Sequence, residues 1–242
     1  MAGLVSTIAY LVVLQKNETF EGNGYEIDID GYSNWKGLFQ IFRTGSSAPS
    51  SLDDAPTVRN VHIIGGETSN EGGFVVQAEQ KHFIVESCSA TGVIHGQGSP
   101  YWDGGGGICG QECAGDILIT HCWSSGQIGY GAGGIAGKTI GRNAGGKVTI
   151  THCHSTGDIV ESIGGGICGS RAGSSGGHVS MAHSYSTGKI SGGGGICGRD
   201  AGIQGGHVSI AHSHSTGEIT VLHLTVREYV VLVLAEAMAM SI

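Results

Sequence analysis

Single apolar residues alternate with small or polar residues along most of this chain. In the stretch GGHVSIAHSHSTGEI, residues 205–219, Val208 and Ile210 fall on one face of a strand, and Ser209 and Ala211 fall on the other. Such a period of two is typical of a short β-strand that buries one face. The Ser-Thr-Gly that follows is typical of a turn.

The same pattern recurs upstream. The clear copies are GGHVSMAHSYSTGKI (176–190) and GGKVTITHCHSTGDI (145–159), and weaker copies are DILITHCWSSGQI (116–128) and HFIVESCSATGVI (82–94). The last four copies begin at Asp116, Lys147, His178 and His207, at intervals of 31, 31 and 29 residues, and a GGICG or GGIAG motif follows the copies. A unit of this length cannot bury its own apolar face, so we expect the units to stack.

Short strands, glycine at every corner and no helical period in the repeats predict an all-β fold. We expect a single-domain, right-handed parallel β-helix of about seven or eight coils with non-repeat ends, in which equivalent residues form columns. Ile150, Met181 and Ile210 should be nearly inaccessible core residues. We expect the turn glycines to adopt positive φ, and the glycines of GGICG to allow close approach between coils.

The chain divides into three predicted regions. Residues 1–81 should form an N-terminal cap and irregular coils, in which Tyr25, Ile27 and Ile29 share one strand face and Phe39 and Ile41 share another. Residues 82–219 should form the regular repeats, and residues 220–242 an apolar tail outside the repeat. The apolar run at the N-terminus lacks the basic start of a signal peptide, so we expect a first strand or an end cap there.

The tail abandons the repeat abruptly, because glycine disappears and the run reads VREYVVLVLAEAMAM. Codons read two bases out of step would permit a G-I-C-G-like motif followed by Ala and Gly at the repeat spacing. We therefore hypothesise that a frameshift truncated a longer array at this point. The alternative is a genuine apolar cap, since solenoids need atypical ends. The nucleotide sequence distinguishes the two hypotheses.

The pattern V-x-I-x-H-S-x-S-T-G-x-I followed by GG-I-C-G resembles the GLUG-type glycine-rich repeats of bacterial surface proteins. Similar repeats occur in uncharacterised proteins of large DNA viruses. The resemblance spans residues 83–219 and implies a right-handed parallel β-helix at a cell surface or in a virion, with no shared catalytic residues. This chain departs from the family where His121, His152, His183 and His212 stand at a position that usually holds asparagine.

Composition and charge exclude several classes of protein and of binding partner. The chain has 46 glycines but only 3 prolines, so it is not collagen-like. Its formal net charge is −8, which argues against nucleic acid because no basic patch exists to neutralise phosphates. No apolar run is long enough for a membrane span. The stretch AGGIAGKT, residues 132–139, imitates a phosphate-binding loop, but its glycines recur in every repeat without the lysine, so we interpret them as turn glycines.

The cysteines fall into two repeat columns, in which serine or alanine replaces cysteine in other copies. One column holds Cys88, Cys122 and Cys153, and the other holds Cys109, Cys168 and Cys197. A site that alternates between cysteine, serine and alanine requires a small residue. We expect reduced thiols that pack in ladders, although stacked coils would also bring cysteines within disulfide range.

Histidines and aromatic residues form further columns, and they are the binding candidates. These residues are Trp123, His152, His154, His183, Tyr185, His212 and His214. A zinc site needs three or four convergent ligands. Alternation of small, aromatic and histidine residues at equivalent positions is instead typical of stacking, so we predict no metal and no cofactor.

No pair of carboxylates is placed for acid–base catalysis, so we expect no enzyme and assign no catalytic residues. The predicted function is structural or adhesive, with a regular surface presented to carbohydrate or to another protein, and an extracellular, cell-surface or virion setting. The first alternative is a carbohydrate-processing β-helix lyase or hydrolase. The second is ice or crystal-surface binding through the column Thr91, Thr156, Thr187 and Thr216.

Overall fold

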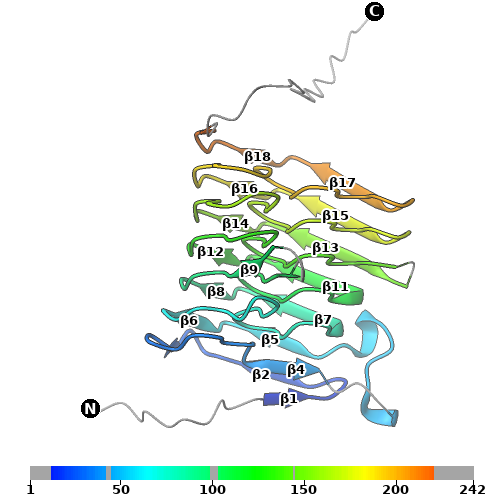
Figure 1. Cartoon of the computed structure of the whole chain (residues 1–242). Helices are drawn as coiled ribbons and strands as arrows, with labels where there is room; N and C mark the ends of the chain where they lie inside the picture. The colour runs from blue at the N-terminus through cyan, green and yellow to red at the C-terminus, as the bar shows by residue number, and fades with distance from the viewer. Residues whose placement is uncertain (1–11, 42–44, 99–102, 144, 221–242) are drawn as a thin grey trace, which may run out of the picture.

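A computed structural model describes residues 12–41, 45–98, 103–143 and 145–220. Two seven-stranded sheets, parallel throughout, run the length of the molecule (Figure 1). The first sheet contains β2 (Thr19–Glu21), β5 (Thr57–Arg59), β7 (Lys81–Glu86), β11 (Ala114–Thr120), β13 (Lys147–Thr151), β15 (His178–Ala182) and β17 (His207–Ala211). The second contains β3 (Glu26–Asp28), β6 (His62–Ile64), β8 (Ser89–Ala90), β12 (Trp123–Ser124), β14 (His154–Ser155), β16 (Tyr185–Ser186) and β18 (His214–Ser215).

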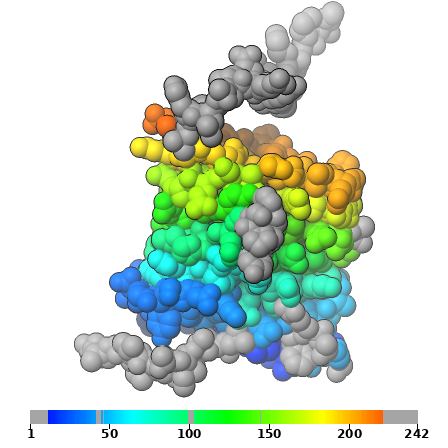
Figure 2. All heavy atoms as spheres, in the orientation of Figure 1, coloured from blue at the N-terminus to red at the C-terminus, as the bar shows by residue number. Residues whose placement is uncertain are grey.

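Each coil passes through the first sheet, turns a corner, passes through the second sheet and returns along a third side. The third side is held by isolated parallel bridges between equivalent residues, such as the series Cys109 to Ala136, Ala136 to Cys168 and Cys168 to Cys197. The result is a parallel β-solenoid of about six turns, so the expected seven or eight coils is slightly too many. In Figure 2 the coils lie on one another in chain order along a single axis.

The core is built from columns of equivalent apolar residues. Ile119 pairs with Ile150, Ile150 with Met181, and Met181 with Ile210 in unbroken register. Ile150 and Met181 are 0% and 1% exposed, as the alternation predicts. Neighbouring strands of a sheet lie about 4.8 Å apart, so each of these side chains contacts the equivalent side chain above and below.

Two residues of the expected core are exposed instead. Ile210 is 48% exposed, because it lies in the last coil that the structure describes and no described strand pairs with the far edge of β17. Tyr25 is 76% exposed, because its amide donates to the carbonyl of Gly22 in the turn that precedes β3. The alternation therefore begins at Ile27, two residues later than the sequence suggested.

The corner glycines fall into two groups, and one group has the expected positive φ, as at Gly141 with φ 68°. The glycines of the Ser-Thr-Gly turn and of its Ser-Ser-Gly variant, among them Gly157 and Gly126, are absent from the positive-φ residues. They are glycines because a Cβ on Gly157 would overlap the carbonyl oxygen of Gly126 in the coil below. The GGICG motif obeys the same constraint, as expected, since a Cβ on Gly134 would overlap the carbonyl oxygen of Gly166.

Strands that precede the regular repeats belong to the same two sheets. Several shorter elements lie outside these sheets. β1 (Val12–Leu14) pairs with β4 (Phe39–Ile41) in parallel, and β9 (Gly96–Gln97) pairs with β10 (Asp103–Gly104) antiparallel. Two 3₁₀ turns are η1 (Gly45–Ser47) and η2 (Leu52–Asp54). Residues 1–11 and 221–242, on which the N-terminal and tail hypotheses depend, lie outside the described residues. No helix in the described part is long and apolar enough to cross a membrane.

Candidate functional site

Four histidines form a continuous stack at the corner between the two sheets. The ring centroids of His121 and His152 are 4.9 Å apart, those of His152 and His183 5.0 Å, and those of His183 and His212 4.9 Å. The planes deviate from parallel by only 7°, 16° and 8°. We call this set the histidine column.

The backbone conformation of the corner explains why the residues align. The four histidines have φ between 48° and 55°, in the left-handed region. Asparagine, aspartate and histidine are the non-glycine residues enriched there. Asn60, at φ 55°, directly follows β5 just as His121 directly follows β11. The repeated left-handed corner gives every histidine the same departure angle, so the rings stack.

Threonine hydroxyls orient the first two rings of the column. Nδ1 of His121 lies 2.9 Å from Oγ1 of Thr120, and Nδ1 of His152 lies 2.9 Å from Oγ1 of Thr151. A hydroxyl can donate to a neutral imidazole or accept from a protonated one, so these contacts are compatible with both charge states. They leave Nε2 as the ring nitrogen available to a ligand.

A second stack runs beside the histidine column along the second sheet. Its ring centroids are 6.1 Å apart for Trp123 and His154, 4.8 Å for His154 and Tyr185, and 5.5 Å for Tyr185 and His214. The planes are within 11° of parallel. Partial burial lowers the pKa of His154, because desolvation disfavours the charged ring. We call this set the aromatic column.

The side chains between the two columns point inward and support them. Cys122, Cys153 and Ser184 are fully or almost fully buried at successive levels. All seven cysteines are free, and all but Cys197 are buried, in agreement with the packing ladders expected from the sequence. Burial and contact with Cys153 and Cys88 raise the pKa of the Cys122 thiol, so this thiol is uncharged and inert at neutral pH.

The outward-facing positions around the two columns hold no ionisable side chains other than histidine and tyrosine. The surface comprises residues 118–125, 149–156, 180–187 and 209–216, in which Asp, Glu, Lys and Arg are all absent. We call this surface the histidine face. The threonine column, Thr156, Thr187 and Thr216, is exposed along its border. Charged residues flank the face where each coil enters and leaves it, as at Asp116 and Asp158, and at Glu86 in the preceding coil.

The geometry of the columns does not converge on a metal ion. Rings in parallel planes direct their nitrogens along parallel lines, whereas a tetrahedral site needs nitrogens that point to one centre. Among the described residues there is no group of three or more His, Cys, Asp or Glu side chains that could hold a metal ion. Two protonated rings at 4.9 Å would repel each other by about 1 kcal/mol in water. The column therefore presents a line of separate hydrogen-bonding groups.

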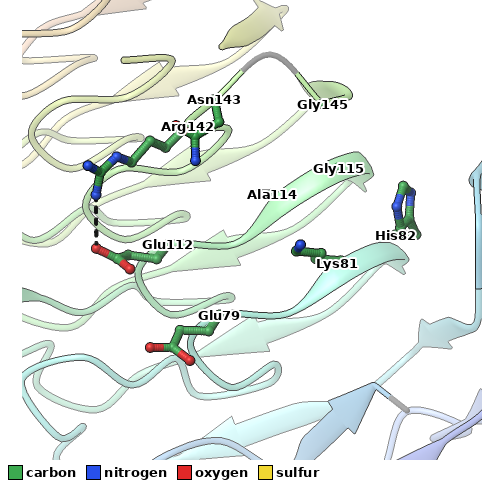
Figure 3. A pocket seen from close by; sticks show the side chains of 9 residues that line it. All are labelled: Glu79, Lys81, His82, Glu112, Ala114, Gly115, Arg142, Asn143 and Gly145. Atoms are coloured by element: carbon green, nitrogen blue, oxygen red, sulfur yellow. Dashed lines mark ion pairs between the residues drawn. The ribbon is translucent and has the colours of Figure 1, made fainter. Parts of the chain in front are cut away.

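The sequence did not reveal a charged groove on another side of the solenoid. A hollow of about 380 Å³ is lined by residues of successive coils, including Glu79, Lys81, Glu112 and Arg142 (Figure 3). Arg142 Nη1 lies 3.6 Å from Glu112 Oε1. A second hollow of about 120 Å³ shares Glu112 and Arg142 and continues to Arg171.

Partial burial and neighbouring charges shift the pKa values of Glu71 and of Lys138, which lines the second hollow. Partial burial, together with Asp103, Glu79 and Glu112, raises the pKa of Glu71. Partial burial, reinforced by Arg171, lowers the pKa of Lys138. Shifted carboxyl and ammonium groups beside a hollow are typical of functional sites and of structural ion networks alike. The recurring Arg142, Arg171 and Arg199 were the available sequence signal. The carboxylate neighbours of Arg142 and Arg171 come from an adjacent coil, at Glu112 and Asp200.

The structure brings all seven candidate residues together on the histidine face, and it adds His121. A separate stack of His178 and His207, with ring centroids 5.6 Å apart, lies at the start of the first-sheet strands and outside the face. The fold defines a parallel β-solenoid protein. Comparisons with protein-family models, with curated proteins and with solved structures find no match.

Proposed function

We propose that the protein is a non-catalytic structural or adhesive solenoid that presents the histidine face to a carbohydrate or protein partner. The observation that carries the proposal is the histidine face itself. It extends over four coils, its histidine column repeats at nearly constant spacing, and it lacks Asp, Glu, Lys and Arg in a chain of net charge −8. Stacked rings on a buried support form a preorganised surface, which loses little conformational entropy when it binds.

The test places one carboxylate on the face and one away from it. Thr156→Glu puts a charge on the border of the face, where the side chain is exposed. Gln204→Glu puts the same charge on an exposed position of the groove side. Oε1 of Gln204 accepts a hydrogen bond from Oγ of Ser175 at 2.9 Å, and a glutamate carboxylate can accept the same bond. Binding to a panel of immobilised polysaccharides and to immobilised copies of this chain should weaken for Thr156→Glu alone. Equal binding by both variants to every surface would contradict the proposal.

A carbohydrate-processing enzyme is the second candidate function, and the groove favours it. Glu79 and Glu112 line it on adjacent coils with Lys81 and Arg142 beside them (Figure 3), and paired carboxylates are what glycoside cleavage requires. The assay is release of reducing ends from polysaccharides. The adhesive proposal predicts no release. Release by the wild type that disappears in Glu112→Gln would contradict the adhesive proposal and favour the enzymatic function.

Ice or crystal-surface binding would use the exposed threonine column. This column contributes one threonine per coil at Thr156, Thr187 and Thr216, and serine replaces it at Ser125. Thermal hysteresis of a dilute solution is the measurement. The adhesive proposal predicts none, and hysteresis that disappears in Thr187→Glu would favour the ice-binding alternative.

A further inference from the structure

Half of the histidines in the chain lie on one uncharged surface. The chain has 12 histidines, and six of them stand on the histidine face, at His121, His152, His154, His183, His212 and His214. Histidine is the side chain whose ordinary charge change falls between about pH 5 and pH 8. Acidification in this range therefore adds a line of positive charge along the histidine column, with a second, sparser line at His154 and His214 beside it.

Few opposing charges lie near these lines. In the first sheet, Glu86 of β7 pairs with Thr120 beside the first ring of the histidine column. Asp116 and Lys147 lie where the coils enter the face, and Asp158, Lys189 and Glu218 lie where they leave it. Tyr185 is the other titratable group within the face, and the buried Cys122 and Cys153 lie beneath it. None of the four rings in the histidine column has a carboxylate partner in the described structure.

The spacing of the charges selects the shape of the ligand. Neighbouring rings of the histidine column are 4.9 to 5.0 Å apart along a straight line parallel to the solenoid axis. Like charges held this close repel one another, and a row of anions laid along the column would remove that repulsion. A linear polymer with regularly repeated anionic groups supplies such a row, whereas a single small anion neutralises only one or two rings.

We propose that the histidine face binds a linear anionic polysaccharide, sulfated or carboxylated, when its histidines are protonated, below about pH 6. This inference rests on the adhesive function proposed above and names the partner class and the condition for binding. The formal charge of the whole chain rises from −8 to +4 when all 12 histidines are protonated, since −8 + 12 = +4. At neutral pH the acidic chain repels the same polymer.

Two double variants provide a matched pair for the test. His152→Asn with His183→Asn removes the two central rings of the histidine column, and asparagine tolerates the left-handed corner, as Asn60 shows. His178→Asn with His207→Asn removes another stacked pair that lies outside the face. Both double variants change the charge at acid pH by the same amount, so any difference between them reports position rather than net charge.

The measurement is binding of fluorescent dextran sulfate, polygalacturonate and uncharged dextran at pH 5.0 and pH 7.5, with circular dichroism at each pH. We expect the wild type to bind one or both anionic polymers at least tenfold more tightly at pH 5.0, and uncharged dextran at neither pH. The contrast between the two anionic polymers identifies sulfate or carboxylate as the preferred group. Since one exposed ion pair changes a binding constant by about 1.5-fold to 5-fold, the His152/His183 variant should lose roughly tenfold, and the control should stay within about twofold.

Several outcomes would overturn the inference. They are no binding at pH 5.0, no difference between the two pH values, equal losses in the two double variants, equal affinity for duplex DNA, and unfolding of the wild type at pH 5.0. Failure of this inference is distinguishable from failure of the adhesive function. A pH-independent partner that is still lost in Thr156→Glu would leave the adhesive function intact.

Discussion

Ile150 and Ile210 occupy the same repeat position but differ in burial, which makes them a controlled pair for measuring what a neighbouring coil contributes. Ile150 is 0% exposed between Ile119 and Met181, and Ile210 is 48% exposed at the last described coil. Replacement of isoleucine by alanine removes three carbon atoms. At about 0.8 kcal/mol for each buried carbon, the transfer contribution for Ile150 is about 2.4 kcal/mol.

A cavity adds to the cost at Ile150, because the paired strands on both sides limit collapse, so we expect Ile150→Ala to cost 2–5 kcal/mol in total. Ile210→Ala removes side-chain atoms that are half in water and leaves no enclosed cavity, so we expect about 1 kcal/mol. Equilibrium unfolding in urea, followed by circular dichroism, measures both variants. A cost below about 0.5 kcal/mol for Ile150→Ala would refute the register of the core. Equal costs would show that other residues cover the last coil.

Three further predictions concern thiols, glycines and pH. Titration of the denatured protein with a thiol reagent should count seven thiols, since all seven cysteines are free, and a count of one would indicate three disulfides. Gly157→Ala should destabilise the fold by at least 1 kcal/mol, because its Cβ would overlap the Gly126 carbonyl, whereas Gly145→Ala, with no atom within 4 Å, should change the melting temperature little. The pKa of Glu71 is raised from its ordinary value of 4.5, so ionisation of Glu71 disfavours the folded state as the pH rises above this value. Glu71→Gln should therefore increase the free energy of unfolding by a few tenths of a kcal/mol at pH 7 and not at pH 4. A loss of stability at pH 7 would contradict this prediction.

The repeat period and the alternation within it were sufficient to predict the parallel β-solenoid. Ile150 and Met181 are buried because a period of two leaves only one face for the core, and a unit of about 30 residues can cover that face only by stacking. The alternation of cysteine with serine and alanine at equivalent positions likewise predicted packed thiols, and all cysteines but Cys197 are buried. These features depend on local spacing, which a sequence displays directly.

Local spacing did not reveal which residue turns each corner. Glycines such as Gly141 have positive φ as expected, but the left-handed corner between the two sheets falls on His121, His152, His183 and His212. Glycine is required at Gly157 by the carbonyl of the coil below, which is a contact between residues 31 positions apart in the chain. Only the stacked structure distinguishes a conformational requirement from a steric one.

The exposure of the last coil and the groove between successive coils also depend on the tertiary structure. Ile210 has the same local sequence as a core residue, yet it is exposed because burial in a solenoid depends on the next coil. Glu79, Glu112 and Arg142 line one hollow because corners of successive coils lie above one another. The sequence alone determined the repeat, its strands and the parity of the core. The tertiary structure decided the corner conformations, the spacing of the stacked rings and the groove, because each depends on contacts between coils.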